Sequence, residues 1–192
     1  KTTMKNHFRN DYSSYHVVGY DADTGEVISK NTHQGYSDNS SWSRGQAWAL
    51  YGYTMIYRET NDPIFLKHAE NVANYIINIA KLPEDFVPLW DFDLQDLKTE
   101  SRDASAAAII ASALYELSML TEQDNKQYLN VANGIMGALS SDSYFNVKGA
   151  NKGFLLKHST GSKPKNSEVD VPLIYADYYY LEALSRKIEI NN

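Results

Sequence analysis

The sequence contains no cysteine, few prolines and glycines, and no long apolar run. Without cysteine the chain can form neither a disulfide nor a thiolate metal site. Five prolines and ten glycines are too few for a disordered chain, and no segment is long and apolar enough for a membrane span. Acidic residues number 24 and basic residues 18, so the net charge is −6, which argues against a nucleic-acid partner. An anionic substrate would therefore need a local cationic pocket.

The length and composition are those of a globular protein. Its 192 residues suffice to bury a sizeable core, and 43% of them are hydrophobic. We therefore expect one domain over residues 1–192. Fifteen residues are tyrosines, a side chain that suits surfaces that are both apolar and hydrogen-bonding.

Apolar residues recur at helical spacing through most of the chain. The expected helices cover about 42–57, 63–80, 103–120 and 125–139, and a last one begins near Pro172. Asp62 and Pro63 predict a helix start, because aspartate caps helices and proline favours the first helical position. Between the helices we expect a small hairpin within 11–28 and a polar loop over 149–168.

Two of these helices repeat each other. The pattern Phe65-Leu66-x-x-Ala69-x-x-Val72 returns 63 residues later as Tyr128-Leu129-x-x-Ala132-x-x-Ile135. The repeating unit is then a helix pair, which must stack on other pairs to bury its apolar faces. The sequence predicts an all-α fold, an α/α helical-pair array that is a solenoid or, if closed, a toroid. The chain holds about two and a half to three pairs, so both end faces would need covering by something further.

The polar segment 33–48, which runs into the first long helix, has the composition of a sugar-acid site. The indoles of Trp42 and Trp48 can lie against sugar rings, and Arg44 can bind a carboxylate through two parallel hydrogen bonds. Gln34 can address hydroxyl groups, as can His33 and Gln46. The alternative is that both tryptophans belong to the core, which is the commoner role of such residues at the start of an apolar helix.

The start of that helix adds to the hypothesis. Ser40 or Ser41 is the expected N-cap, which would place residues 42–46 in the first turn. Unpaired backbone N–H groups and the helix dipole favour an anion there.

Six runs of the sequence together resemble the unsaturated glucuronyl hydrolases, glycoside hydrolase family 88. The runs are Tyr15-His16-Val17-Val18, Thr32-His33-Gln34-Gly35-Tyr36, Ser41-Trp42-Ser43-Arg44-Gly45-Gln46-Ala47-Trp48, Leu89-Trp90-Asp91-Phe92, Arg102-Asp103-Ala104-Ser105-Ala106-Ala107 and Asp177-Tyr178-Tyr179-Tyr180-Leu181-Glu182-Ala183-Leu184. The similarity extends over essentially the whole chain. It implies the C-terminal half of a closed toroid of six helix pairs.

The resemblance also implies an activity. Such enzymes release 4,5-unsaturated glucuronic acid from the non-reducing end of oligosaccharides left by polysaccharide lyases. An aspartate protonates the ring double bond and activates the water that adds across it, without a metal or other cofactor. The substrate-binding positions that match are His16, Gln34, Trp42, Arg44 and Trp48. The family's catalytic aspartates lie upstream of the matched part, which leaves the catalytic residues of this chain unknown and makes the other half of the enzyme its expected partner. The expected compartment is the bacterial cytoplasm or periplasm.

Other polar residues have two interpretations each. Asp103 is either an acid or, more in keeping with its place before a helix, a cap. Asp91 and Asp93 either orient substrate or fix their loop. His33, His68 and His158 show no metal-ligand spacing, and we expect His68 to be solvated. Lys157 and His158 form either a basic lip or an ordinary polar loop.

Two other functions compete with hydrolysis. A half-toroid with an intact aromatic and arginine wall can bind uronic-acid oligosaccharides without cleaving them. The chain can also be a structural α/α array whose pocket features only pack.

Overall fold

The computed structural model describes residues 1–96, 98–122 and 124–192. Its principal helices are α2 (Ser43–Thr60), α3 (Pro63–Asn74), α4 (Ala104–Leu120), α5 (Asn125–Leu139) and α6 (Ile174–Asn191). Shorter helical segments are α1 (Thr2–Asn6), the π-helix η1 (Tyr75–Ala80) that continues α3, and the 3-10 turn η2 (Asn151–Gly153). The strands are β1 (Val17–Tyr20), β2 (Val27–Asn31), β3 (Ser159–Ser162) and β4 (Ser167–Val171).

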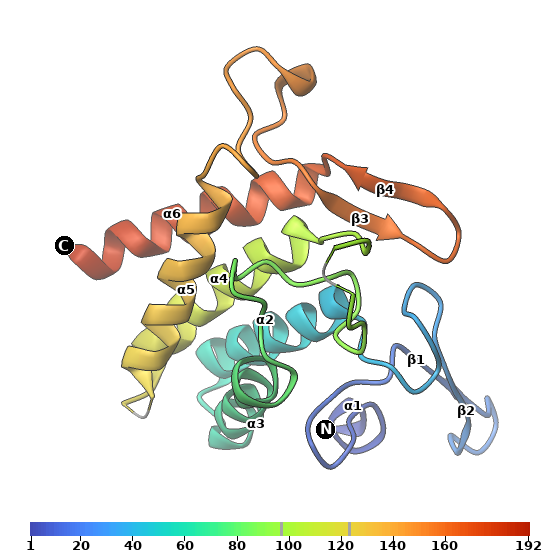
Figure 1. The fold of residues 1–192 in the computed structure, drawn as a ribbon. Coiled ribbons are helices and arrows are strands. Elements are labelled where there is room, and N and C mark those ends of the chain that lie inside the picture. The colour runs from blue at the N-terminus through green and yellow to red at the C-terminus, as the bar shows by residue number, and fades with distance from the viewer. Residues whose placement is uncertain (97, 123) are drawn as a thin grey trace.

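The long helices form two layers. Helices α2, α4 and α6 lie side by side, with α4 in the middle, while α3 packs on α2 and α5 packs on α4 (Figure 1). This is the helical-pair array that the sequence repeat predicts, with α3 and α5 as the repeating helices. Every residue of α4 from Ala104 to Ser118 is buried. Its many alanines allow the neighbouring helices to approach closely on both sides.

Local sequence explains where several helices begin. Asp62 caps α3 by accepting the backbone N–H of Ile64 at 3.1 Å, and Pro63 is the first helical residue, as predicted. Asp103 caps α4 by accepting the N–H of Ser105 at 3.1 Å, which confirms the capping interpretation of this aspartate. Helix α5 has the predicted bounds.

Two hairpins accompany the helices. The first, β1–β2, is antiparallel and occupies the predicted segment. The second, β3–β4, lies partly within the segment 149–168 that was expected to be a loop. That expectation was wrong because β3 has the sequence Ser-Thr-Gly-Ser, which lacks the apolar alternation of a strand. Its support comes from distant residues, chiefly Arg44 and Gln34, which bind its carbonyl groups.

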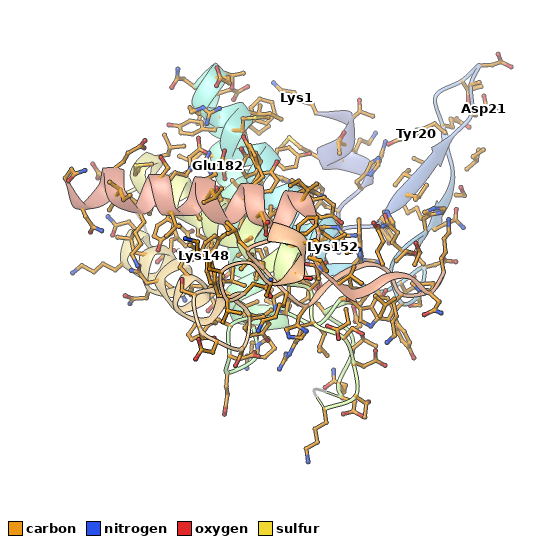
Figure 2. The ribbon with its side chains drawn as sticks, turned by 90° about the horizontal axis from the view of Figure 1, so that it is seen from above. Lys1, Tyr20, Asp21, Lys148, Lys152 and Glu182 are labelled. Atoms are coloured by element: carbon orange, nitrogen blue, oxygen red, sulfur yellow. The ribbon has the colours of Figure 1, made fainter. Side chains whose placement is uncertain are left out.

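Both hairpins lie at one end of the helical array, beside the residues at which α2, α4 and α6 begin (Figure 1). In the view from above, Tyr20 and Asp21 mark the tip of the first hairpin, which projects away from the helices, and Glu182 lies along α6 (Figure 2). The side-chain amide of Gln34 donates to the carbonyl of Gly161 at 2.7 Å and so joins the two hairpins. No helix in the described part of the chain is long and apolar enough to cross a membrane.

The environment of His68 differs from the expected one. We predicted a solvated side chain, but the residue is only 5% exposed. Its ring has edge-on contacts with Phe8, Tyr12 and Tyr53 at centroid distances of 4.4, 5.5 and 4.2 Å. The charged neighbours Lys67 and Glu70 misled the prediction, because they lie on a different face of α3 from His68.

Candidate functional site

The chain entering α2 is held by a second loop. The backbone N–H of Phe92 donates to the carbonyl of Ser41 at 2.9 Å, and the N–H of Ser43 donates to the carbonyl of Trp90 at 3.3 Å. This pairing keeps Trp42 extended (φ −61°, ψ 120°) and makes Trp42 the N-cap residue of α2, without a capping side chain. The predicted cap at Ser40 or Ser41 was therefore wrong, because the Ser40 hydroxyl is bound to Asp91 at 2.7 Å instead.

His16 and Trp42 form a stacked pair at this end of α2. Their ring centroids are 4.4 Å apart and the planes make an angle of 27°. The Nδ1 atom of His16 accepts the backbone N–H groups of His33 at 3.1 Å and of Gln34 at 3.2 Å. Burial, helped by the positive charge of Arg44 and by His33, lowers the pKa of His16 to about 4. The imidazole is consequently neutral near pH 7.

Arg44 is buried, with 3% of its surface exposed, and its guanidinium is bound by protein groups. Nη1 donates to the Asp103 carboxylate at 2.7 Å and to the Thr160 carbonyl, and Nη2 donates to the Gly161 carbonyl at 2.6 Å. The cation also lies over the Trp42 ring at 4.7 Å. Both Nη atoms are thus engaged, whereas we expected them to bind a substrate carboxylate. Asp103 also balances the charge of Arg44, so the local cationic pocket that an anion would need is not supplied by Arg44 alone.

A direct contact between Arg44 and substrate stays a prediction. In the described structure Arg44 instead binds two carbonyl groups of β3 and packs against one face of the Trp42 ring. Arg44 also lies 5.4 Å from the ring of Tyr175, the second residue of α6. Tyr175 was not singled out as a site residue, because it lies far along the chain and nothing in the local pattern marks its proximity to the segment 33–48.

The remaining candidates divide between a cavity and the hairpin junction. His16, Trp42 and Trp48 line a cavity of about 340 Å³ that continues along α2 past Gly45 and Gly52. Trp48 is 36% exposed and has an edge-on contact with Tyr179 at 5.1 Å, whereas Trp42 is 8% exposed. Gln34 lies at the hairpin junction, where its side-chain amide shares the Gly161 carbonyl with Arg44. Four of the five candidates, His16, Gln34, Trp42 and Arg44, are therefore in one connected cluster, and Trp48 adds an exposed aromatic surface nearby.

The carboxylates of Asp91 and Asp93 accept hydrogen bonds from neighbouring parts of the chain. Asp91 is fully buried and accepts the backbone N–H of Tyr36 at 2.8 Å and the hydroxyl of Ser40 at 2.7 Å. Burial raises the pKa of Asp91, against the lowering effect of these hydrogen bonds. The carboxylate of Asp93 accepts the backbone N–H of Ser41 at 2.7 Å. These contacts favour the loop-fixing interpretation of both residues.

Lys157 and His158, for which a basic lip and an ordinary polar loop were the two interpretations, are both bound by protein groups. His158 pairs with Asp170 at 2.6 Å, and the ammonium of Lys157 donates to the carbonyl of Asp142 at 2.7 Å. Lys165, in the turn of the second hairpin, instead reaches Nε2 of His33 at 2.6 Å. Lys165, which the sequence pattern did not single out, thus brings a positive charge next to His33.

Comparisons with known proteins identify similar sequences and structures. An unsaturated glucuronyl hydrolase of Formosa agariphila is 50% identical over 186 residues, which are 97% of this chain and 46% of the relative. The structure of an unsaturated glucuronyl hydrolase specific for heparin matches with a TM-score of 0.96 at 55% identity, covering 99% of this chain and 51% of that chain. A structure of the Streptococcus agalactiae enzyme complexed with dGlcA-GalNAc6S matches with a TM-score of 0.82 at 36% identity, covering 95% of this chain and 48% of that chain. No protein-family model matches the chain.

Fold and site together define a protein of the α/α toroid class, with an aromatic-lined cavity that runs along α2 from its first turn. Within that class the chain belongs to the unsaturated glucuronyl hydrolase family. It spans about half the length of the relatives it matches. The family resemblance and the fold class inferred from the sequence are thereby confirmed.

Proposed function

We propose that this chain is the C-terminal half of a hydrolase that releases 4,5-unsaturated glucuronic acid from the non-reducing end of lyase-generated oligosaccharides. The reaction is hydration of the ring double bond, after which the resulting hemiketal opens and expels the remaining sugar. The observation that carries the proposal is the 50% identity to a named unsaturated glucuronyl hydrolase over nearly the whole chain. The substrate class is an unsaturated uronic-acid oligosaccharide, in line with the dGlcA-GalNAc6S bound by one relative.

The described residues suit one wall of such a site. The exposed indole of Trp48 and the edge of the His16–Trp42 stack give the cavity apolar surface for a sugar ring. His16 supplies a hydrogen-bond donor beside it. The relatives named above are associated with different glycans, one with heparin and one with dGlcA-GalNAc6S. The proposed substrate is therefore defined by its unsaturated terminal sugar and not by the sugars that follow it.

The catalytic acid is proposed to come from the other half of the enzyme. Asp91 and Asp103 are both fully buried and bound to protein groups, so neither presents a carboxyl group to the cavity. This arrangement agrees with the family resemblance, which places the catalytic aspartates upstream of the matched part. The extent of the domain over 1–192 and the bacterial compartment stay predictions.

The test follows the ultraviolet absorbance of the conjugated double bond in a lyase-generated unsaturated disaccharide. The disaccharide is mixed with the 192-residue chain, and separately with the same chain extended by the residues that its gene encodes ahead of Lys1. We expect absorbance to fall only with the extended protein. A loss with the short chain would place a catalytic carboxyl group within it. Binding without any loss in both proteins would establish the non-catalytic alternative.

A further inference from the structure

The turn Thr32–Gln34 surrounds the Nδ1 atom of His16 with hydrogen-bond donors. The backbone N–H groups of His33 and Gln34 point at this nitrogen from 3.1 and 3.2 Å. The hydroxyl oxygen of Thr32 lies 3.3 Å from it and accepts the N–H of Gly35 at 2.8 Å. Gly35 uses one of the two lone pairs of that oxygen, and the hydroxyl hydrogen is free to point toward Nδ1 once the two backbone amides have made that nitrogen an acceptor.

This environment decides where the imidazole proton lies. A neutral imidazole carries one proton, on either Nδ1 or Nε2. A proton on Nδ1 would meet the hydrogens of two backbone amides, whereas a lone pair there accepts them. The proton is therefore on Nε2. The stack with Trp42, at 4.4 Å, opposes rotation of the ring that would exchange the two nitrogens.

We propose that Thr32 is a positioning residue of the sugar site, which together with the amides of His33 and Gln34 holds His16 as a neutral imidazole with its Nε2–H available to an oxygen atom of the ligand. The ligand part of this inference rests on the proposed function. The tautomer does not, because it follows from contacts within the chain. Thr32 is itself held, since its backbone N–H donates to Asp38 at 2.8 Å.

The charges around His16 keep the imidazole in this form. Arg44 lies beyond Trp42, and His33 lies 6.3 Å away between ring centroids with Lys165 against its Nε2. Cations on this side oppose a second proton on His16, and burial acts in the same direction. His16 consequently acts as a hydrogen-bond donor of fixed direction and not as a proton donor in the reaction. It favours a hydroxyl, carboxylate or sulfate oxygen as its partner.

The direct experiment is long-range proton–nitrogen correlation NMR on the chain labelled with ¹⁵N-histidine. The His16 signals are assigned by their loss in His16→Gln. We expect a protonated Nε2 and a bare Nδ1 at neutral pH, unchanged on acidification to about pH 5. A proton on Nδ1, or titration near the ordinary histidine pKa, would overturn the assignment. Because the spectrum is independent of activity, it decides the tautomer even where the proposed hydrolysis fails.

Thr32→Val and Thr32→Ser then separate positioning from simple packing. Valine keeps the shape of threonine and removes the hydroxyl, so the His16 spectrum should show a mixture of tautomers or titrate at higher pH, and serine should restore the wild-type spectrum. In the extended, active protein, Thr32→Val should raise KM for the unsaturated disaccharide several-fold with a smaller change in kcat. An unchanged His16 spectrum in Thr32→Val would show that Thr32 does not position the imidazole. A changed spectrum with unchanged KM rules out the contact between His16 and ligand. Should the valine variant not fold, Thr32→Ala, which also lacks the hydroxyl, takes its place in the same comparison.

Discussion

At the scale of single residues, the guanidinium of Arg44 is bound by groups far along the chain, and its contact with substrate stays a prediction. Residue type and spacing showed that Arg44 begins a helix beside two tryptophans. They did not show that Asp103, Thr160 and Gly161 would occupy its guanidinium, because those residues lie far along the chain and the second hairpin was not foreseen. An arginine in a polar segment is equally suited to a ligand and to buried carbonyls, and only the tertiary structure distinguishes them.

Replacing Arg44 with alanine should therefore destabilise the fold itself. The change leaves the fully buried carboxylate of Asp103 without its cation and the β3 carbonyls without their donors. We expect a loss of about 3 kcal/mol in the free energy of unfolding, measured by urea denaturation of the chain. Lys67→Ala is the matched control, because the lysine of the Lys67–Glu70 ion pair is exposed. Losing this pair should lower the free energy of unfolding by less than about 1 kcal/mol. Equal stability of the two variants would contradict a structural role of Arg44 and leave ligand binding as its remaining role.

His68 predicts a pH dependence of stability. Burial lowers its pKa in the folded chain to about 4, below the ordinary value of 6.5 expected in the unfolded chain. As the pH falls below 6.5, the unfolded chain binds a proton that the folded chain does not, so stability declines until about pH 4. The contribution lost between about pH 7 and about pH 5 is about 2 kcal/mol. Urea denaturation of wild type and His68→Phe at both pH values measures it, and identical pH dependence in the two proteins would contradict it.

At the scale of elements, helical periodicity was enough to predict the long helices but not the start of α2 or the second hairpin. The bounds of α5 and the caps of α3 and α4 follow from local sequence, since apolar spacing and capping aspartates act within a few residues. The start of α2 does not, because the pairing of Ser41 and Ser43 with the segment 90–92 moves the cap to Trp42. Strand β3 was missed for the same reason, because Arg44 and Gln34 bind its carbonyl groups from other parts of the chain.

Two glycines of α2 offer a matched pair of substitutions. A Cβ atom on Gly45 would lie 2.7 Å from Cε3 of Trp42, so the indole packs directly on the space that Gly45 leaves. A Cβ atom on Gly52 would meet nothing within 4 Å. We expect Gly45→Ala to displace the indole and to cost about 1–3 kcal/mol. Gly52→Ala should stabilise the helix by about 0.5–1 kcal/mol.

Thermal denaturation and near-ultraviolet circular dichroism of both variants test this difference. The tryptophan signal should change in Gly45→Ala and stay as in wild type in Gly52→Ala. A Gly45→Ala protein with a wild-type spectrum and unchanged stability would mean that the Trp42 ring has room to move. The stacked position of His16 would then not depend on the helix beneath it.

At the scale of the whole molecule, helices α2, α4 and α6 are joined by a network of ion pairs and hydrogen bonds between residues far apart in the sequence. Arg186 of α6, which is buried, binds Glu116 of α4 at 2.6 Å and Glu182 of its own helix at 3.1 Å. Arg58 of α2 binds the other oxygen of Glu116, and Tyr51 of α2 donates to Glu182 at 3.0 Å. The network thus links α2, α4 and α6, although the helical repeat predicted only that these helices pack.

Glu116→Gln should accordingly weaken the association of α2, α4 and α6. The variant keeps the shape of the side chain but removes one of the two carboxylates that face the buried Arg186. Glu182 remains as a partner, and the weaker compensation of the buried cation should cost about 2 kcal/mol in the free energy of unfolding. Arg58→Ala is the control, since the Arg58 side chain is 43% exposed and Glu116 would retain Arg186 as partner. We expect that control to lose less than about 1 kcal/mol, because water screens exposed pairs. Urea denaturation measures both variants. A Glu116→Gln protein as stable as Arg58→Ala would show that packing of α4 against its neighbours holds the array without the network.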